Sequence, residues 1–163
     1  MASPVTKTAA KPVASKTPAT TYRIAYKIPG LEAELERADT RLIPVIRTAA
    51  EFLTERGQTL TVTCVFRTAD VQAAYRAECQ RLGRTDEPVK SPHEDGRGVD
   101  IRTRGIPRDA VKELVALLNK THPYAPAGTS AARYPTALFH DVGQGEHIHI
   151  QVRPLAAKMA KVS

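Results

Sequence analysis

One short segment of the sequence, residues 91–101, combines a histidine and a carboxylate at a spacing that suits metal binding. His93 lies seven residues before Asp100, and the two glycines between them let the backbone turn sharply. We therefore expect His93 on a loop and Asp100 on the strand that follows it. Imidazole nitrogen and carboxylate oxygen are both ligands that zinc accepts.

A second segment, residues 145–151, alternates histidine with isoleucine. On an extended strand, His147 and His149 project from one face while the isoleucines beside them pack into the core. One of these histidines, together with the histidine and the aspartate of the first segment, supplies the three ligands of a catalytic zinc, which leaves a fourth position for water. Zinc also needs no redox partner, so it is the metal we expect first.

A site of this kind requires a general base that takes a proton from the attacking water, and two candidates precede His149. Under strict strand alternation Glu146 faces away from His149, so it must lie on a bend or bulge at the start of the strand. His147 lies on the correct face without such an irregularity. The spacing leaves both residues open as the base.

The order and spacing of these residues resemble those of a known family. The pattern consists of Ser91-x-His93-x-x-Gly96-x-x-x-Asp100 followed by Glu146-His147-x-His149. It is similar to that of the zinc D-alanyl-D-alanine carboxypeptidase-like peptidases, which include D-Ala-D-Ala dipeptidases and phage L-alanyl-D-glutamate endolysins and share their fold with the hedgehog signalling domain. The resemblance extends over residues 40–152. It implies a compact α+β domain in which a small antiparallel sheet, flanked by helices, carries the zinc.

The resemblance also implies roles for individual residues. It makes His93, Asp100 and His149 the zinc ligands. It makes Glu146, three residues before the last ligand, the catalytic acid or base. His147 then lies beside the metal, where it assists the base or orients the substrate.

An upstream segment, residues 62–72, adds to the resemblance. It matches a strand followed by an arginine and a glutamine, and the resemblance directs the arginine, Arg67, into the pocket to stabilise the substrate carbonyl as it becomes an oxyanion. Ser91 matches a position that shapes the substrate pocket. At Gly98 this chain departs from the family, which usually has alanine there.

The patterning along the chain predicts an α+β domain over residues 22–155, because helices come first and strands concentrate in the second half. Pro44 is expected to break or kink the first helical region, and Tyr75 is expected in the core. His122 and His140 are expected to be ordinary surface or core histidines. The predicted helices cover 31–56, 69–82 and 107–120, and the predicted strands or extended segments cover 22–28, 59–66, 99–103, 137–142 and 147–152.

The formal charge of +7 gathers at the two ends of the 163-residue chain. Residues 1–31 carry five basic residues and residues 151–163 carry three, with no acid in either range, which leaves 16 basic against 17 acidic residues in 32–150. This distribution does not indicate a basic groove within the fold, so nucleic acid is not the expected partner. Residues 1–21 are expected to form a disordered basic arm, which serves either as a cell-wall anchor or as a tether to a larger assembly, and residues 156–163 a flexible tail.

Two cysteines, Cys64 and Cys79, are too few for a disulfide framework or a thiolate zinc site. No segment has the roughly 18 apolar residues of a membrane span, and the first residues lack the apolar core of a secretory signal. We therefore expect synthesis in the cytoplasm. We expect the protein to act at the bacterial cell wall, which it reaches by release through a holin, by delivery on a phage or injection particle, or by non-classical export.

The sequence thus predicts a zinc peptidase that cleaves the stem peptides of peptidoglycan, as a D,D-carboxypeptidase or an L-Ala-D-Glu endopeptidase. The alternative is a non-catalytic zinc-containing binding or structural module of a cell-wall or phage-type assembly. The presence of both Glu146 and Arg67 favours the enzyme, because a purely structural metal site needs neither residue.

Overall fold

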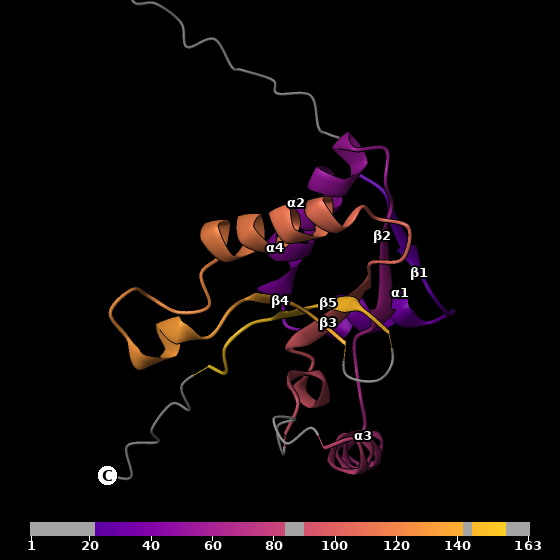
Figure 1. Ribbon diagram of the computed structural model, residues 1–163, viewed down its shortest axis with the longest axis vertical. Helices are drawn as coiled ribbons and strands as arrows, with labels where there is room; N and C mark the ends of the chain where they lie inside the picture. The colour runs from indigo at the N-terminus through magenta and orange to yellow at the C-terminus, as the bar shows by residue number, and fades with distance from the viewer. Residues whose placement is uncertain (1–21, 84–89, 142–144, 156–163) are drawn as a thin grey trace, which may run out of the picture.

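A computed structural model describes residues 22–83, 90–141 and 145–155 (Figure 1). The predicted arm, 1–21, and the predicted tail, 156–163, lie outside the described residues. Within the described ranges the chain forms an α+β fold with four α-helices, two short 3-10 helices and one five-stranded sheet. No helix in these ranges is long and apolar enough to cross a membrane.

The predicted helices and strands are confirmed to within a few residues at their ends, apart from the first helical region. In chain order the elements are β1 (Ile24–Tyr26), α1 (Leu31–Arg37), α2 (Leu42–Glu55), β2 (Leu60–Cys64), α3 (Ala69–Arg81), η1 (Pro92–Asp95), β3 (Gly98–Arg102), α4 (Arg108–Thr121), η2 (Ser130–Arg133), β4 (Ala137–His140) and β5 (His147–Gln151).

The sheet is mixed, so the prediction of an antiparallel sheet was wrong at one edge. Its strand order is β1-β2-β3-β5-β4, and β1 runs parallel to β2 whereas the other neighbours are antiparallel. The reason is the connection between the first two strands, which passes through α1 and α2 and returns the chain to its starting end. Such a crossover joins parallel strands, while a tight turn joins antiparallel ones.

The first helical region breaks at Ala38, where the backbone is extended, and not at Pro44 as predicted. The carboxylate of Asp39 accepts hydrogen bonds from the backbone and side chain of Arg41, which compete with continued helix. Pro44 is the third residue of α2. It is tolerated there because the first turn of a helix leaves its N–H groups without helical partners.

Helices α2 and α4 cover one face of the sheet, and α3 lies on the other side (Figure 1). The core is built between the sheet and these two helices, and Ile148 and Ile150 of β5 are fully buried in it. The alternation along β5 therefore turns His147 and His149 to the opposite face, as predicted. The other fully buried members of the core are Leu42, Ala49, Ala50, Leu53, Leu60, Val62, Val65, Val99, Ile101, Leu114 and Leu118.

Candidate metal centre

Three side chains converge on the face of the sheet opposite α2 and α4: His93 from η1, Asp100 from β3 and His149 from β5. The register pairs Asp100 directly with His149. Asp100 Oδ1 lies 2.9 Å from His149 Nδ1 and 3.1 Å from His93 Nε2, and these two nitrogens are 3.2 Å apart. Each residue is at most 9% exposed. We call these residues the His–Asp–His cluster.

Local hydrogen bonds hold His93 in place. The Ser91 hydroxyl accepts from the His93 backbone N–H, and the Glu94 carboxylate accepts from the Ser91 N–H, which together form a capping box. Ser91, which the resemblance places in the substrate pocket, is buried here and positions His93. The Ser-x-x-Glu spacing of residues 91–94 is the sequence signal that predicts this capping box.

The charge of the cluster follows from its burial and its hydrogen bonds. Burial lowers the pKa of the His93 imidazole, but hydrogen bonds to Asp100 and Cys64 outweigh burial and raise this pKa to about 10. Burial raises the pKa of Asp100, yet hydrogen bonds from His149 and His93 hold it well below its usual range. Burial also lowers the pKa of His149. The ionised Asp100 carboxylate therefore favours a cation at the converging atoms, either a proton on His93 or a metal ion in its place.

The donor atoms of the cluster suit a metal ion in both chemistry and spacing. Ligands held about 2.0–2.1 Å from a tetrahedral zinc lie roughly 3.3 Å from one another, close to the separations in the cluster. The Val65 carbonyl accepts a hydrogen bond from His93 Nδ1 at 2.9 Å, which leaves Nε2 directed at the other two donors. An outer partner of this kind fixes the tautomer of a metal-binding histidine.

A second donor set, Cys64, His93 and Asp100, overlaps with the cluster. Its ligand atoms lie within 4.8 Å of one another, so it could also hold a metal ion. The Cys64 sulfur lies 3.8 Å from His93 Nδ1, the nitrogen that already donates to the Val65 carbonyl. The His–Asp–His cluster uses the other nitrogen and is the tighter of the two sets. The sequence analysis did not identify Cys64 as a possible ligand.

Arg67 points into the site from the segment after β2, as the resemblance implies. Its Nη2 lies 3.5 Å from Asp100 Oδ2, and its Nη1 donates to Gln72 Oε1 at 2.9 Å. Its guanidinium also lies 4.3 Å from the centre of the Tyr75 ring. Tyr75 therefore borders the site instead of filling the core, because α3 turns Gln72 and Cys79 inward. The Arg67 side chain is 8% exposed, and Asp100, Gln72 and Tyr75 hold its guanidinium.

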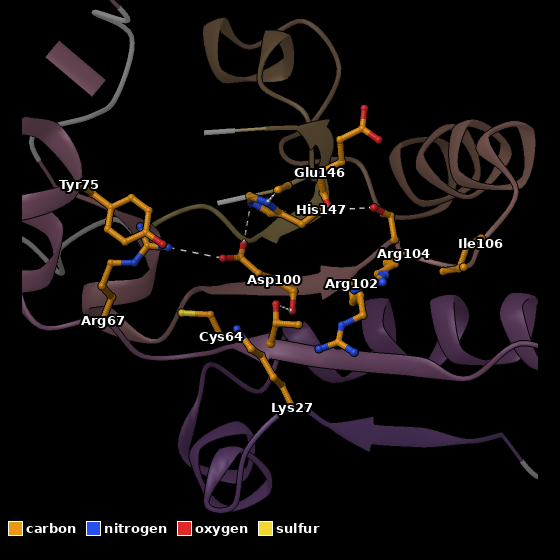
Figure 2. A pocket seen from close by; sticks show the side chains of 14 residues that line it. Lys27, Cys64, Arg67, Tyr75, Asp100, Arg102, Arg104, Ile106, Glu146 and His147 are labelled. Carbon is orange, nitrogen blue, oxygen red and sulfur yellow. Dashed lines mark hydrogen bonds and ion pairs between the residues drawn. The ribbon is translucent and has the colours of Figure 1, made fainter. Parts of the chain in front are cut away.

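The two candidate bases are placed differently (Figure 2). His147 Nε2 lies 3.7 Å from Asp100 Oδ1, and the Gly145 carbonyl accepts from His147 Nδ1 at 2.9 Å. The Glu146 carboxylate points away from Asp100 and forms a 3.1 Å ion pair with Arg108. The structure thus brings His147 to the cluster and leaves Glu146 at its edge, about half exposed.

His140 of β4 also lies on this face of the sheet. The register pairs His140 with His147, and their ring centres are 4.6 Å apart. The sequence did not indicate this position beside the site, and the pairing of β4 with β5 is the feature that produces it. The expectation that His140 is an ordinary histidine and not a ligand stays a prediction. His122 lies away from the site, with its Nε2 2.9 Å from the Thr48 hydroxyl.

Asp100 lines a cleft with a volume of about 690 Å³, within the range of small-molecule sites, while His93 and His149 lie behind it. Figure 2 shows the Asp100 carboxylate between Arg67 and His147. The described residues that line the cleft are Lys27, Thr63, Cys64, Arg67, Tyr75, Asp100, Arg102, Thr103, Arg104, Gly105, Ile106, Gly145, Glu146 and His147.

Gly98 provides space for the cluster at the start of β3. A Cβ on this residue would lie 3.1 Å from His149 Cε1 and 3.3 Å from the His93 backbone nitrogen. Because Gly98 has no side chain, His93 and His149 pack closely against its bare backbone.

Comparison of the chain with protein-family models, with curated proteins and with solved structures gave no match.

Proposed function

We propose that this protein is a zinc-dependent peptidase that cleaves the stem peptides of bacterial peptidoglycan. The observation that carries the proposal is the convergence of His93 Nε2, Asp100 Oδ1 and His149 Nδ1 within 3.2 Å of one another beside a cleft that Asp100 lines. Two imidazoles and one carboxylate form the protein ligand set of a catalytic zinc site that keeps one position open. The resemblance of the sequence pattern to the zinc D-alanyl-D-alanine carboxypeptidase-like peptidases suggests the stem peptides of peptidoglycan as the substrate class.

The His–Asp–His cluster would hold the ion, which, when bound, lowers the pKa of a water molecule and polarises the scissile carbonyl. Arg67 stabilises the carbonyl oxygen as negative charge develops on it. Gln72 and Tyr75 keep its guanidinium aimed at Asp100, so little reorganisation is needed during the reaction.

His147 is the base that this arrangement supports best. Its Nδ1 donates to the Gly145 carbonyl, so the Nε2 that faces the cluster is free to accept a proton from the attacking water and to pass it to the departing amine. Glu146 performs this step only after its carboxylate leaves Arg108 and turns toward the cluster. The resemblance favours Glu146 and the geometry favours His147, so variants of both residues are required.

The proposal is tested by digestion of purified peptidoglycan with the zinc-loaded protein, followed by mass spectrometry of the products. We expect released D-Ala or split stem peptides, and the identity of the product names the bond that is cleaved. A chelator removes this activity, and zinc restores it. Loss of the base lowers turnover by about 10²–10⁴-fold in either Glu146→Ala or His147→Ala, while the protein keeps its zinc.

The matched control is His122→Gln, because this histidine lies outside the site, and it keeps full activity. Intact muropeptides after incubation with folded, zinc-loaded wild-type protein would contradict the peptidase proposal.

One observation favours a second candidate, a non-catalytic zinc-containing module. The ion pair between Glu146 and Arg108 turns away the carboxylate that the resemblance makes catalytic. A module of this kind binds zinc and stem peptide but releases no product. Zinc-dependent retention of the intact peptide on the immobilised protein would identify it.

A further inference from the structure

Three cationic side chains line the cleft below and to the right of Asp100 in Figure 2: Lys27 after β1, Arg102 at the end of β3 and Arg104 in the turn that follows. We call these residues the cationic wall. All three are exposed. The near-neutral charge balance of residues 32–150 gave no indication of Arg102 and Arg104 as a local excess of charge, because charges that balance over the sequence are separated in space, and Lys27 comes from the basic range 1–31.

The acidic residues of the cleft are already compensated by other cations. Asp100 lies 3.5 Å from Arg67, and Glu146 lies 3.1 Å from Arg108. Among the described residues, no side-chain hydrogen bond or ion pair joins a carboxylate to any of the three members of the cationic wall. The wall therefore carries three positive charges that a bound anion can neutralise, and a divalent metal at the cluster would strengthen the same field.

The backbone fixes where this charge lies relative to the cluster. Arg102 is two residues after Asp100 on the same strand and the same face, so their Cα atoms are about 7 Å apart. Arg104 lies in a tight turn in which the Ile106 N–H donates to the Thr103 carbonyl at 2.9 Å. Gly105 supplies the positive φ of 88° that this turn requires.

The start of β5 holds this turn in place. The Thr103 hydroxyl donates to the Glu146 carbonyl at 2.8 Å, which joins the segment carrying Arg104 to the strand that carries His147 and His149. The turn that carries Arg104 is thus joined to the strand that carries two of the site histidines, and the cationic wall and Asp100 line the same cleft.

We propose that the cationic wall is a carboxylate-binding subsite, which selects peptides with a free carboxylate about two residues from the bond at the cluster. An extended peptide advances about 3.3–3.6 Å per residue, so two residues span the separation between Asp100 and Arg102. This inference rests on the proposed function, and it specifies the class of peptide: acidic, and not amidated at the group that faces the wall.

The test uses a synthetic stem peptide that contains L-Ala-D-Glu and ends in D-Ala-D-Ala. It is prepared as the free acid and in two amidated forms, one with a carboxamide at the glutamate carboxylate and one at the C-terminus. Affinity for the zinc-loaded full chain is measured by calorimetry, and KM is added where a product forms. The quantity compared is the dissociation constant of each amide divided by that of the free acid.

We expect the free acid to bind about tenfold more tightly than one of the amides, as suits one charge-assisted contact. The ratio falls toward one in the Arg102→Gln/Arg104→Gln double variant and in Lys27→Gln, which provides a second route if the double variant does not fold. It also falls at high salt. The matched control is Arg47→Gln, an exposed arginine on α2 outside the cleft, and it keeps the wild-type ratio.

Equal binding of all three peptides to the wild type would overturn the proposal, as would an unchanged ratio in the folded wall variants. A single-stranded oligonucleotide that binds through these three residues, while the peptides bind equally, would assign the wall to nucleic acid. A wall-dependent preference without any cleavage would support the subsite and contradict the peptidase, so the two proposals fail separately.

Discussion

Replacement of Asp100 by asparagine tests the metal centre, because this carboxylate is the one negative charge of the His–Asp–His cluster. In the wild type it faces His93 at 3.1 Å, His149 at 2.9 Å and Arg67 at 3.5 Å. The Asp100→Asn change keeps the shape of the side chain and removes its charge. The imidazoles and the guanidinium then face a neutral amide, and a metal ion loses its anionic ligand.

Asp100→Asn lowers the free energy of unfolding through two separate contributions. Without zinc, removal of one partner from a buried ionic group costs about 3 kcal/mol of unfolding free energy. With zinc at about 100 times its dissociation constant, the wild type gains about 2.7 kcal/mol from binding. For a domain of about 130 residues this gain raises Tm by about 10 °C. The variant loses both contributions.

The assay is thermal unfolding of metal-free protein with increasing zinc, for the wild type, Asp100→Asn and Asp109→Asn. Asp109 is an exposed carboxylate at the start of α4, so its variant keeps the wild-type zinc response. A Tm that rises equally in the wild type and in Asp100→Asn would refute the assignment of Asp100 as a ligand. No rise in the wild type would refute the metal centre.

Three further predictions address the neighbouring residues. Cys64→Ser retains zinc binding and His149→Ala loses it, as measured by competition with a chromophoric chelator; the opposite result would assign the metal to the set that contains Cys64. Gly96→Ala lowers the free energy of unfolding, measured in urea, by about 1–3 kcal/mol, because φ is 65° and the new Cβ lies 2.7 Å from the Phe66 ring. Gly57→Ala lowers it less, because φ is 70° but no atom lies within 4 Å of the new Cβ. Equal losses in the two variants would contradict the steric argument. Arg67→Lys lowers kcat on stem peptides by about 10²-fold with zinc retained, because a lysine cannot reproduce the forked contact with Asp100 and Gln72; unchanged kcat would remove Arg67 from the reaction.

The sequence predicted the cluster because its signals are local. Alternation along β5 placed His149 on the face opposite Ile148 and Ile150, and the glycine-rich segment returned the chain so that His93 meets Asp100. Antiparallel pairing of β3 with β5 then brought the two halves together. The spacing within each segment is visible in the sequence, whereas the joining of the two segments in one site came from the family resemblance.

The features that were missed depend on tertiary packing. The place where the first helix ends is set by Asp39, whose backbone N–H donates to the Gly96 carbonyl of a distant segment. Tyr75 borders the cleft because α3 packs through Gln72 and Cys79, which apolar periodicity does not reveal. The cationic wall combines β1 with β3, and no pattern within either segment indicates that they share a cleft.

The most direct test of the metal centre is a crystal structure of the zinc-loaded protein, with diffraction data collected on both sides of the zinc absorption edge. We predict one anomalous peak bound by His93 Nε2, Asp100 Oδ1 and His149 Nδ1 at about 2.0–2.2 Å, with the fourth position directed into the cleft. A peak bound to Cys64 Sγ, or a cluster without a peak in crystals grown with excess zinc, would contradict this account.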